Sequence, residues 1–288
     1  MAWGFFKKLV IADYFAIFSD KVFEQPYSYR GFALVLGAFF FTVQIYCDFS
    51  AYSDIARGAA KLFGFELMEN FRSPYFSGSI SEFWKRWHIS LSTWFRDYVY
   101  IPLGGNRAGK LRNSLNLMIT FILSGLWHGA NWTFVIWGAV HGAARVAESR
   151  LRLKRPGAKN MLPAAISRVI VFIFVMFAWV WFRSQSAGDA VFFFRNMFDG
   201  ISTPLWYLYS GCFGRSSMGI GIRKQELIRL MISIALLSAY DFASLKTDVI
   251  DWIGRRSFAV RHTVYLLLII AILAFRLIQE VEFVYFRF

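Results

Sequence analysis

A histidine lies inside an apolar run that is long enough to reside in a lipid bilayer, and this feature constrains the fold more than any other. The run covers residues 115–142 and places His128 between Trp127 and Gly129. A titratable side chain at membrane depth is energetically costly, so it must face protein or a cavity. We therefore expect the rest of the chain to position and enclose His128.

The composition predicts an all-α polytopic integral membrane protein. Of the 288 residues, 57% are hydrophobic and 33 are phenylalanines, which is more apolar surface than a soluble domain of this size can bury. The apolar runs are continuous, whereas a transmembrane barrel needs alternating segments. We expect membrane spans at residues 32–46, 164–182, 227–243 and 263–278. An amphipathic helix at residues 3–23 would lie at the interface or pack inside the bundle.

The charge of the chain fits a membrane protein better than a nucleic-acid-binding protein. The formal net charge is +14, and the basic residues gather in short segments between the apolar runs, as in cytoplasmic loops that contact anionic lipids. A nucleic-acid partner would need a basic face on a folded domain, and we expect none. Cys47 and Cys212 are far apart and predict neither a disulfide framework nor a zinc site. The histidine spacings match no metal-binding motif, so no metal is expected.

Basic residues on both sides of the central run predict a hairpin. They are Arg107, Lys110 and Arg112 before it, and Arg145, Arg150, Arg152, Lys154 and Arg155 after it. If basic segments stay in the cytoplasm, both ends of the run lie on one side of the membrane. The run would then form two half-helices of about a dozen residues each, which meet near residues 125–129 with His128 at the tip. Two complete but short spans in a thinned bilayer are the alternative.

Polar residues follow the first expected span closely. Residues 48–57 predict either a helix end that lines a cavity or a solvated helix terminus with an Asp54–Arg57 pair. Further along, residues 203–221 are expected to form a loop, and residues 246–262 a basic polar connection.

Residues 81–100 predict a single helix at the membrane interface. The segment is too polar to span, while its tryptophans and tyrosines suit the boundary between lipid and water. Ser79 or Ser81 would cap the N-terminus of this helix. Glu82 and Arg86 have the i, i+4 spacing of a local ion pair.

His128 is a candidate general base. Gly125 and Gly129 would let the backbone bend and would let another segment or a ligand approach closely. Burial favours the neutral imidazole, which is the form that accepts a proton. The alternative is a histidine that is hydrogen-bonded between two helices.

The other three histidines lie in less specific surroundings. His88, on the expected interfacial helix, is equally consistent with ligand contact and with interface packing. His141 could be a second polar site or a packing residue, and we favour packing. His262 is expected at the surface.

Two stretches together carry a family resemblance. They are SEFWKRWHISLSTWFRDYVYIPLGGNR, residues 81–107, and LSGLWHGANWTFVIWGAVHG, residues 123–142. In this order and spacing they resemble the membrane-bound O-acyltransferase family, and most closely its bacterial branch of alginate O-acetyltransferase membrane subunits. GFFKKLVIAD near the N-terminus and FVYFRF at the C-terminus extend the similarity over nearly the whole chain.

The resemblance implies a fold and two catalytic residues. His128, in the WHG motif, matches the catalytic histidine of the family, and His88, in the RWHISLS motif, matches its second histidine. The implied fold is a helical bundle with a central channel and with short re-entrant or tilted helices around the catalytic histidine. Family members usually carry further helices before the GFFKKLVIAD-like segment. We therefore expect residues 1–288 to be a single membrane-embedded acyltransferase domain, the C-terminal part of the family fold.

The resemblance also implies a reaction and its partners. We expect transfer of an acyl group, acetyl in particular, from a cytoplasmic thioester donor to hydroxyls of an extracytoplasmic polysaccharide, as in alginate or other exopolysaccharide O-acetylation. The donor would be acetyl-CoA or another acyl carrier, with no permanently bound cofactor. Further expected partners are an extracytoplasmic acetyltransferase protein or the polysaccharide, and the lipids of the bacterial inner membrane.

The residue roles and the function keep alternatives at this stage. His128 would remove the acceptor proton or accept the acyl group itself, while His88 would orient the thioester or stabilise charge. Cations that could attract an anionic donor are Lys85, Arg86, Arg107, Lys110 and Arg112. The competing functions are a transporter and a truncated, non-catalytic scaffold of an exopolysaccharide-modification complex. A transporter is disfavoured because intramembrane carboxylates are few and no inverted repeat is present.

Overall fold

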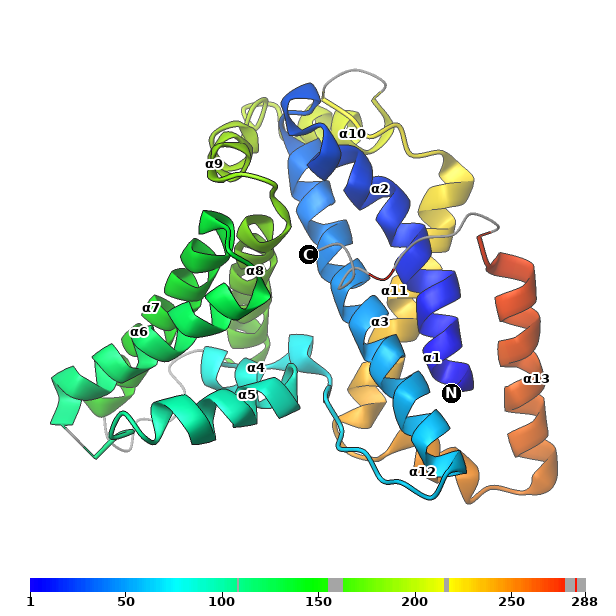
Figure 1. The fold of residues 1–288 in the computed structure, drawn as a ribbon. Coiled ribbons are helices and arrows are strands. Elements are labelled where there is room, and N and C mark those ends of the chain that lie inside the picture. Colours follow the sequence, from blue (N-terminus) through cyan, green and yellow to red (C-terminus); the bar gives the residue numbers. More distant parts are fainter. Residues whose placement is uncertain (108, 155–162, 215–217, 278–282, 284–288) are drawn as a thin grey trace. The chain divides into compact units, whose positions relative to one another are not determined.

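The regular secondary structure of the chain is helical throughout the part that the structure describes. The computed structural model describes residues 1–107, 109–154, 163–214, 218–277 and 283, and every regular element among these residues is a helix (Figure 1). The prediction of an all-α protein is therefore confirmed.

The helices group into two compact units, and each unit is described by itself. Unit 1 is Met1–Glu69 together with Val191–Phe288, and unit 2 is Asn70–Ala190. The expectation of a single acyltransferase domain concerns function as well as packing, and it stays a prediction.

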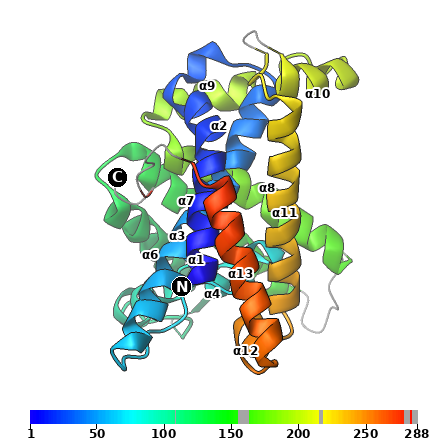
Figure 2. The same ribbon diagram turned by 90° about the vertical axis from the view of Figure 1, so that its right-hand side faces the viewer.

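Unit 1 is built on one long helix pair. Its elements are α1 (Ala2–Phe6), a π-helical segment (Lys7–Ala12), α2 (Asp13–Glu24), α3 (Phe32–Leu62), the end of α9 (Ala187–Asn196), α10 (Pro204–Phe213), α11 (Lys224–Ser244), α12 (Val249–Gly254) and α13 (Phe258–Phe275). The first three elements run on as one helix that packs along α3. Figure 2 shows α11 and α13 beside this pair. The amphipathic N-terminal helix thus packs inside the bundle, with Phe15 and Val22 fully buried.

Two lysines of the π-helical segment point into the core of unit 1. Lys7 and Lys8 are only 4% and 6% exposed. The Nζ of Lys8 lies 2.9 Å from the Asp13 carboxylate and 2.7 Å from that of Asp48. The Nζ of Lys7 lies 3.0 Å from the Asp54 carboxylate. Because a π-helical turn shifts the register of a helix, both adjacent lysines can reach carboxylates on α3.

This buried ionic cluster corrects the prediction for residues 48–57. α3 has 31 residues and continues to Leu62, so these polar residues lie inside the helix and not at its end. At the helical rise α3 is about 46 Å long, which exceeds the apolar thickness of a bilayer. Both alternatives, a cavity-lining helix end and a solvated terminus, are wrong because the N-terminal lysines neutralise the carboxylates in the middle of the helix.

Four helices are long and apolar enough to cross a membrane. They are α3, α11 and α13 in unit 1 and α8 (Ala164–Arg183) in unit 2. All four expected spans therefore have a matching helix, although α13 starts five residues earlier than expected and places His262 on a helix. Residue 278, the predicted end of the last span, lies outside the described residues.

Two segments that we expected to be irregular contain helices. α10 lies within the expected loop 203–221, and α12 within the expected connection 246–262. Pro204 occupies the first turn of α10, where its missing N–H costs nothing, and Tyr207 of this helix is buried against Phe32 with ring centroids 5.3 Å apart. Tertiary packing therefore outweighs the turn-forming composition of this segment.

Breaking the buried ionic cluster should destabilise the protein. A Lys8→Met substitution would leave Asp13 and Asp48 buried without their shared cation, which we expect to lower the free energy of unfolding by about 3–5 kcal/mol. The measurement is equilibrium unfolding in detergent micelles. The control is Arg223→Met, since the Arg223–Glu226 pair is exposed on its arginine side and should contribute less than about 1 kcal/mol. Equal effects of the two substitutions would contradict this prediction.

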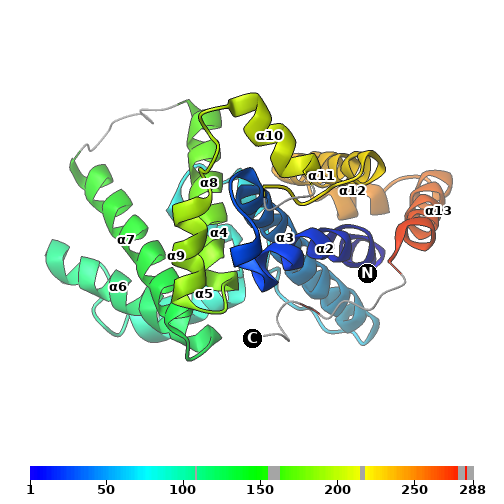
Figure 3. The same ribbon diagram turned by 90° about the horizontal axis from the view of Figure 1, so that it is seen from above.

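Unit 2 is built on an antiparallel helical hairpin. Its elements are α4 (Ile80–Arg86), α5 (Ile89–Phe95), a π-helical segment (Arg96–Tyr100), α6 (Gly109–His128), α7 (Trp132–Lys154), α8 (Ala164–Arg183) and the start of α9. α6 and α7 lie side by side and are joined at residues 129–131 (Figure 3). The predicted hairpin with His128 at its tip is therefore confirmed.

The two helices of the hairpin are longer than expected. α6 has 20 residues and α7 has 23, which corresponds to about 30 and 35 Å instead of two half-helices of about a dozen residues. The basic outer ends remain helical because they bind each other across the hairpin. The guanidinium of Arg150 donates at 2.9 Å to the Lys110 carbonyl and at 2.9 Å to the Ser114 hydroxyl.

Glycines let the backbones of α6 and α7 touch. A Cβ atom on Gly138 would collide with the backbone carbonyl of Phe121, and one on Gly125 with that of Phe134. Gly142, one turn after Gly138, continues the contact strip on α7. Small residues at this spacing are typical of closely packed membrane helices.

A methyl group at the centre of this contact should open the hairpin. For Gly138→Ala we expect a loss of about 1–3 kcal/mol in the free energy of unfolding, because a backbone carbonyl and not a flexible side chain must move. The control is Gly254→Ala, where the added Cβ has nothing within 4 Å and should be neutral or slightly stabilising. Thermal unfolding of both variants in micelles tests the predicted difference in sign.

Candidate functional site

His128 ends α6 at the tip of the hairpin. Its imidazole is half-buried and is surrounded by aromatic rings of α7 and α8. The ring centroids of Trp137 and Phe182 lie 5.4 and 5.0 Å away, both nearly perpendicular to the imidazole. Phe134 lies at 6.3 Å. The rings leave part of His128 accessible, so the site can admit a reactant while most of its wall is apolar.

Asn131 fixes the turn that follows His128. Its side-chain oxygen accepts a hydrogen bond from the Thr133 N–H at 3.1 Å and caps α7. Its side-chain nitrogen donates at 2.9 Å to the carbonyl of Gln185, just beyond the end of α8. One amide thus holds the hairpin tip against the neighbouring helix.

His88 lies at a break between α4 and α5. The backbone of His88 is left-handed, with φ of 43°, and Trp87 before it is extended. The single helix predicted for residues 81–100 is therefore wrong. Asn70 stabilises the break, since its carbonyl accepts from the Ile89 N–H at 3.1 Å and its side chain accepts from the Ser90 N–H at 3.0 Å.

The start of this region matches the prediction more closely. Ser79 caps α4 by accepting from the Glu82 N–H at 3.0 Å, so Ser79 and not Ser81 is the capping residue. Glu82 and Arg86 form the predicted ion pair at 2.6 Å.

The structure brings the two predicted catalytic histidines into one region. Trp87, next to His88, contacts Trp179 of α8 with ring centroids 5.0 Å apart, and Trp179 contacts Phe182, which packs on His128. Burial lowers the pKa of His88 to about 4, so this imidazole is neutral at pH 7 and can accept a hydrogen bond.

The other two histidines differ in their burial. His141 is fully buried on α7 among aromatic side chains, in agreement with the expected packing role. His262 is exposed on α13, where its imidazole stacks on Phe258 at 3.7 Å.

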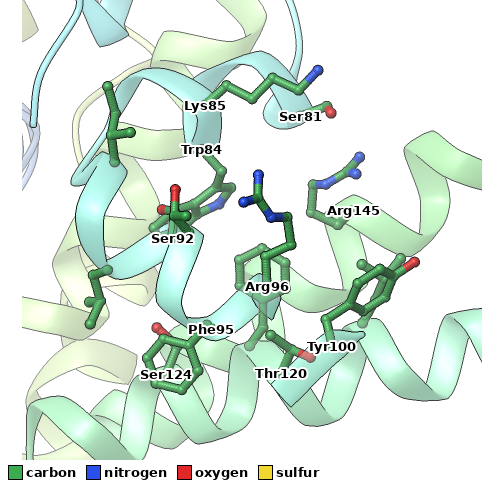
Figure 4. Close-up of a pocket in the computed structure, with 15 residues that line it drawn as sticks. Ser81, Trp84, Lys85, Ser92, Phe95, Arg96, Tyr100, Thr120, Ser124 and Arg145 are labelled. Carbon is green, nitrogen blue, oxygen red and sulfur yellow. The ribbon is translucent and has the colours of Figure 1, made fainter. Parts of the chain in front are cut away.

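A cavity of about 390 Å³ lies in unit 2 between α4, α5, the π-helical segment, α6 and α7. Its lining includes Ile89, which follows His88, and Ser124, which lies one helical turn before His128. Hydroxyl groups and aromatic rings make up much of the remaining wall, as Figure 4 shows. The lining of the cavity therefore includes residues that are close in sequence to both predicted catalytic histidines.

Three cations line this cavity, and no carboxylate does among the described lining residues. They are Lys85, Arg96 and Arg145, which gather at the upper side in Figure 4. Neighbouring carboxylates outside the lining partly neutralise two of them, since Arg96 pairs with Asp97 at 2.7 Å and Arg145 with Glu148 at 2.8 Å. The remaining charge favours an anionic ligand.

The sequence predicted only part of this set. Of the five cations expected to attract a donor, Lys85 lines the cavity, whereas Arg86 is paired with Glu82 and the three others are exposed. Arg96 and Arg145 were not predicted as site residues, since only the helix break at His88 and the fold of the hairpin bring them to one cavity. The described residues hold no group of histidines, cysteines and carboxylates suited to a metal ion.

Comparison with known proteins assigns the family. The model of the membrane-bound O-acyltransferase family matches residues 1–183. The chain belongs to this family. It is a multi-pass protein of the bacterial inner membrane, in agreement with its four apolar helices.

The relatives of the chain carry the names of O-acetylating and D-alanylating enzymes. The chain is 43% identical over 236 residues to a probable alginate O-acetylase of Azotobacter vinelandii. This match covers 82% of this chain and 44% of that protein. It is 39% identical over 201 residues to a peptidoglycan O-acetyltransferase of Helicobacter pylori, with coverage of 69% and 38%. It is 34% identical over 175 residues to a teichoic acid D-alanyltransferase of Streptococcus thermophilus, with coverage of 57% and 42%. The chain spans less than half the length of these relatives.

The left-handed backbone of His88 gives a test of the local structure. Glycine adopts this conformation freely, whereas a β-branched residue is strained there, so His88→Gly should be more stable than His88→Val by about 1–3 kcal/mol. At His262, inside the right-handed helix α13, the order should reverse because glycine is the poorer helix former. Thermal unfolding of the four variants measures both differences. The same order at both positions would contradict the helix break.

Proposed function

We propose that the chain carries the reaction centre of a membrane O-acyltransferase that moves an acyl group, acetyl in particular, from a thioester donor to a hydroxyl of an extracytoplasmic polysaccharide. The family assignment supports acyl transfer, and the relatives named above act on alginate, peptidoglycan and teichoic acid. The observation that carries the proposal is the half-buried His128 at the hairpin tip, with a cationic cavity ending one turn away.

His128 acts at the reacting atoms in this proposal. Its neutral imidazole takes the proton of the acceptor hydroxyl, whose oxygen then bonds to the carbonyl carbon of the thioester. The carbon–sulfur bond breaks, and the imidazolium returns the proton to the leaving thiolate. A variant of this route forms an acyl-imidazole first and passes the acyl group on in a second step.

His88 and the cavity serve the donor. The neutral imidazole of His88 orients the thioester or stabilises charge that develops on it. The cavity accepts the donor, acetyl-CoA or an acyl carrier, and the cations Lys85, Arg96 and Arg145 face its phosphate groups. The donor is a substrate in this scheme, and no resident cofactor takes part.

Replacing His128 tests the function. We expect His128→Ala and His128→Gln to lower acyl transfer by more than about 100-fold, since the general base is lost. The assay follows radiolabelled acetyl from acetyl-CoA to polysaccharide in membranes of a bacterium that lacks its own O-acetylase. Because the chain spans under half of its relatives, it is assayed alone and joined to the remaining part of the A. vinelandii relative.

Two controls make this test decisive. His262→Ala removes an exposed histidine that the proposed reaction does not use and should leave transfer unchanged at equal protein level. Normal polymer acetylation by the His128→Ala variant would sink the catalytic proposal and would favour the non-catalytic scaffold. Uptake of a solute without acyl transfer would favour the transporter.

A further inference from the structure

His141 is a buried histidine that the proposed reaction does not use. It is 0% exposed and sits on α7 between Gly138 and Gly142. Six aromatic rings have centroids within 6.5 Å of its own: Phe83, Trp84, Phe121, Trp137, Phe174 and Trp179. In these surroundings an imidazole costs free energy to bury, because its nitrogens lose their water. Phenylalanine would fill the same space without this cost.

The polar contact of His141 defines its tautomer. The indole N–H of Trp84 donates to the Nδ1 of His141 at 3.3 Å. An indole nitrogen can only donate, so Nδ1 must be the acceptor and the neutral imidazole carries its proton on Nε2. Nε2 is buried and has no hydrogen-bond partner among the described residues. Burial of Nε2 without a partner is therefore unfavourable. The hydrogen bond from Trp84 to Nδ1 is the compensating interaction.

Trp84 is the side chain through which this bond reaches the site. Its indole lines the cationic cavity. The Trp84 indole contacts Trp137 of α7, with ring centroids 5.7 Å apart. Trp137 in turn contacts His128, with ring centroids 5.4 Å apart. The Trp84–Trp137 pair thus connects the wall of the cavity with the hairpin-tip histidine, although neither Trp137 nor His128 is a lining residue.

We propose that His141 is a positioning residue that holds the Trp84 indole in place as part of the wall of the donor cavity, on the side of Trp137 and His128. This inference rests on the proposed function, because it takes the cavity as the donor site. Trp84 comes from α4, a helix of seven residues that ends at the His88 break, so its own helix restrains it little. The bond to α7 ties this short helix to the hairpin and selects one rotamer of the indole.

A double-mutant cycle tests the lock. His141→Phe keeps a ring but removes the acceptor, and Trp84→Phe keeps a ring but removes the donor. In steady-state kinetics with acetyl-CoA, each substitution should raise KM on the order of tenfold and leave kcat nearly unchanged. The double variant should be no worse than the more affected single variant, because both remove one interaction. His141→Gln, whose side-chain carbonyl can accept from the indole, should restore part of the lost affinity.

The matched control is Trp179→Phe. Trp179 also packs near His141, with centroids 6.5 Å apart, but its indole nitrogen has no hydrogen-bond partner among the described residues. Its effect should therefore add to that of His141→Phe. Additive effects of His141→Phe and Trp84→Phe, or a fall in kcat alone, would overturn the positioning role and leave His141 as a packing residue.

A spectroscopic measurement separates this inference from the proposed function. The indole N–H resonance of Trp84 in ¹⁵N-labelled protein in micelles is assigned by its loss in Trp84→Phe. It should shift upfield in His141→Phe and return towards its original position in His141→Gln. An unchanged resonance in His141→Phe would refute the bond even in an active protein. Absence of acyl transfer by the unsubstituted protein would refute the proposed function and leave the resonance to decide the bond.

Discussion

The backbone contact between α6 and α7 is the constraint on which the site depends. Gly138 lies against the carbonyl of Phe121, and Gly125 against that of Phe134, so the two helices can pack in only one register. This register sets His128, at the end of α6, beside Trp137 of α7. A shift by one residue would turn each side chain by about 100° and separate them. The close approach therefore positions the imidazole as well as stabilising the hairpin.

The two units hold buried polar groups by different means. Unit 1 neutralises charge with charge, since Lys8 lies between two carboxylates and fixes the N-terminal helix against α3. Such a buried ion pair adds less stability than its short distances suggest, because both charges lose their water. An incorrect pairing, however, would leave a buried charge unpaired and would be strongly destabilising. Unit 2 surrounds His128 and His141 with aromatic rings and places no carboxylate in ring contact with them among the described residues. Only the second arrangement leaves a titratable group able to take up a proton during a reaction.

The sequence predicted the features that depend on local pattern. Basic flanks and glycines predicted the hairpin and its tip, and hydropathy predicted the spans. The break at His88 was not predictable in this way, because no glycine or proline marks it and its partner is Asn70, eighteen residues upstream. The continuation of α3 past Asp48 depends on a lysine forty residues earlier in the chain. The cavity was missed for the same reason, since its cations come from three separate elements.

The aromatic enclosure has a consequence for the proposed chemistry. Water in the site would compete with the acceptor hydroxyl for the acyl group, so a transferase must keep water from the activated carbonyl carbon until the acceptor arrives. Trp137 and Phe182 cover His128 from two sides and leave the imidazole half-buried. In this apolar surrounding, the positive charge that His128 would gain in the proposed reaction would interact strongly with the developing oxyanion of the thioester. One arrangement of rings thus restricts water and strengthens the charge interaction on which transfer depends.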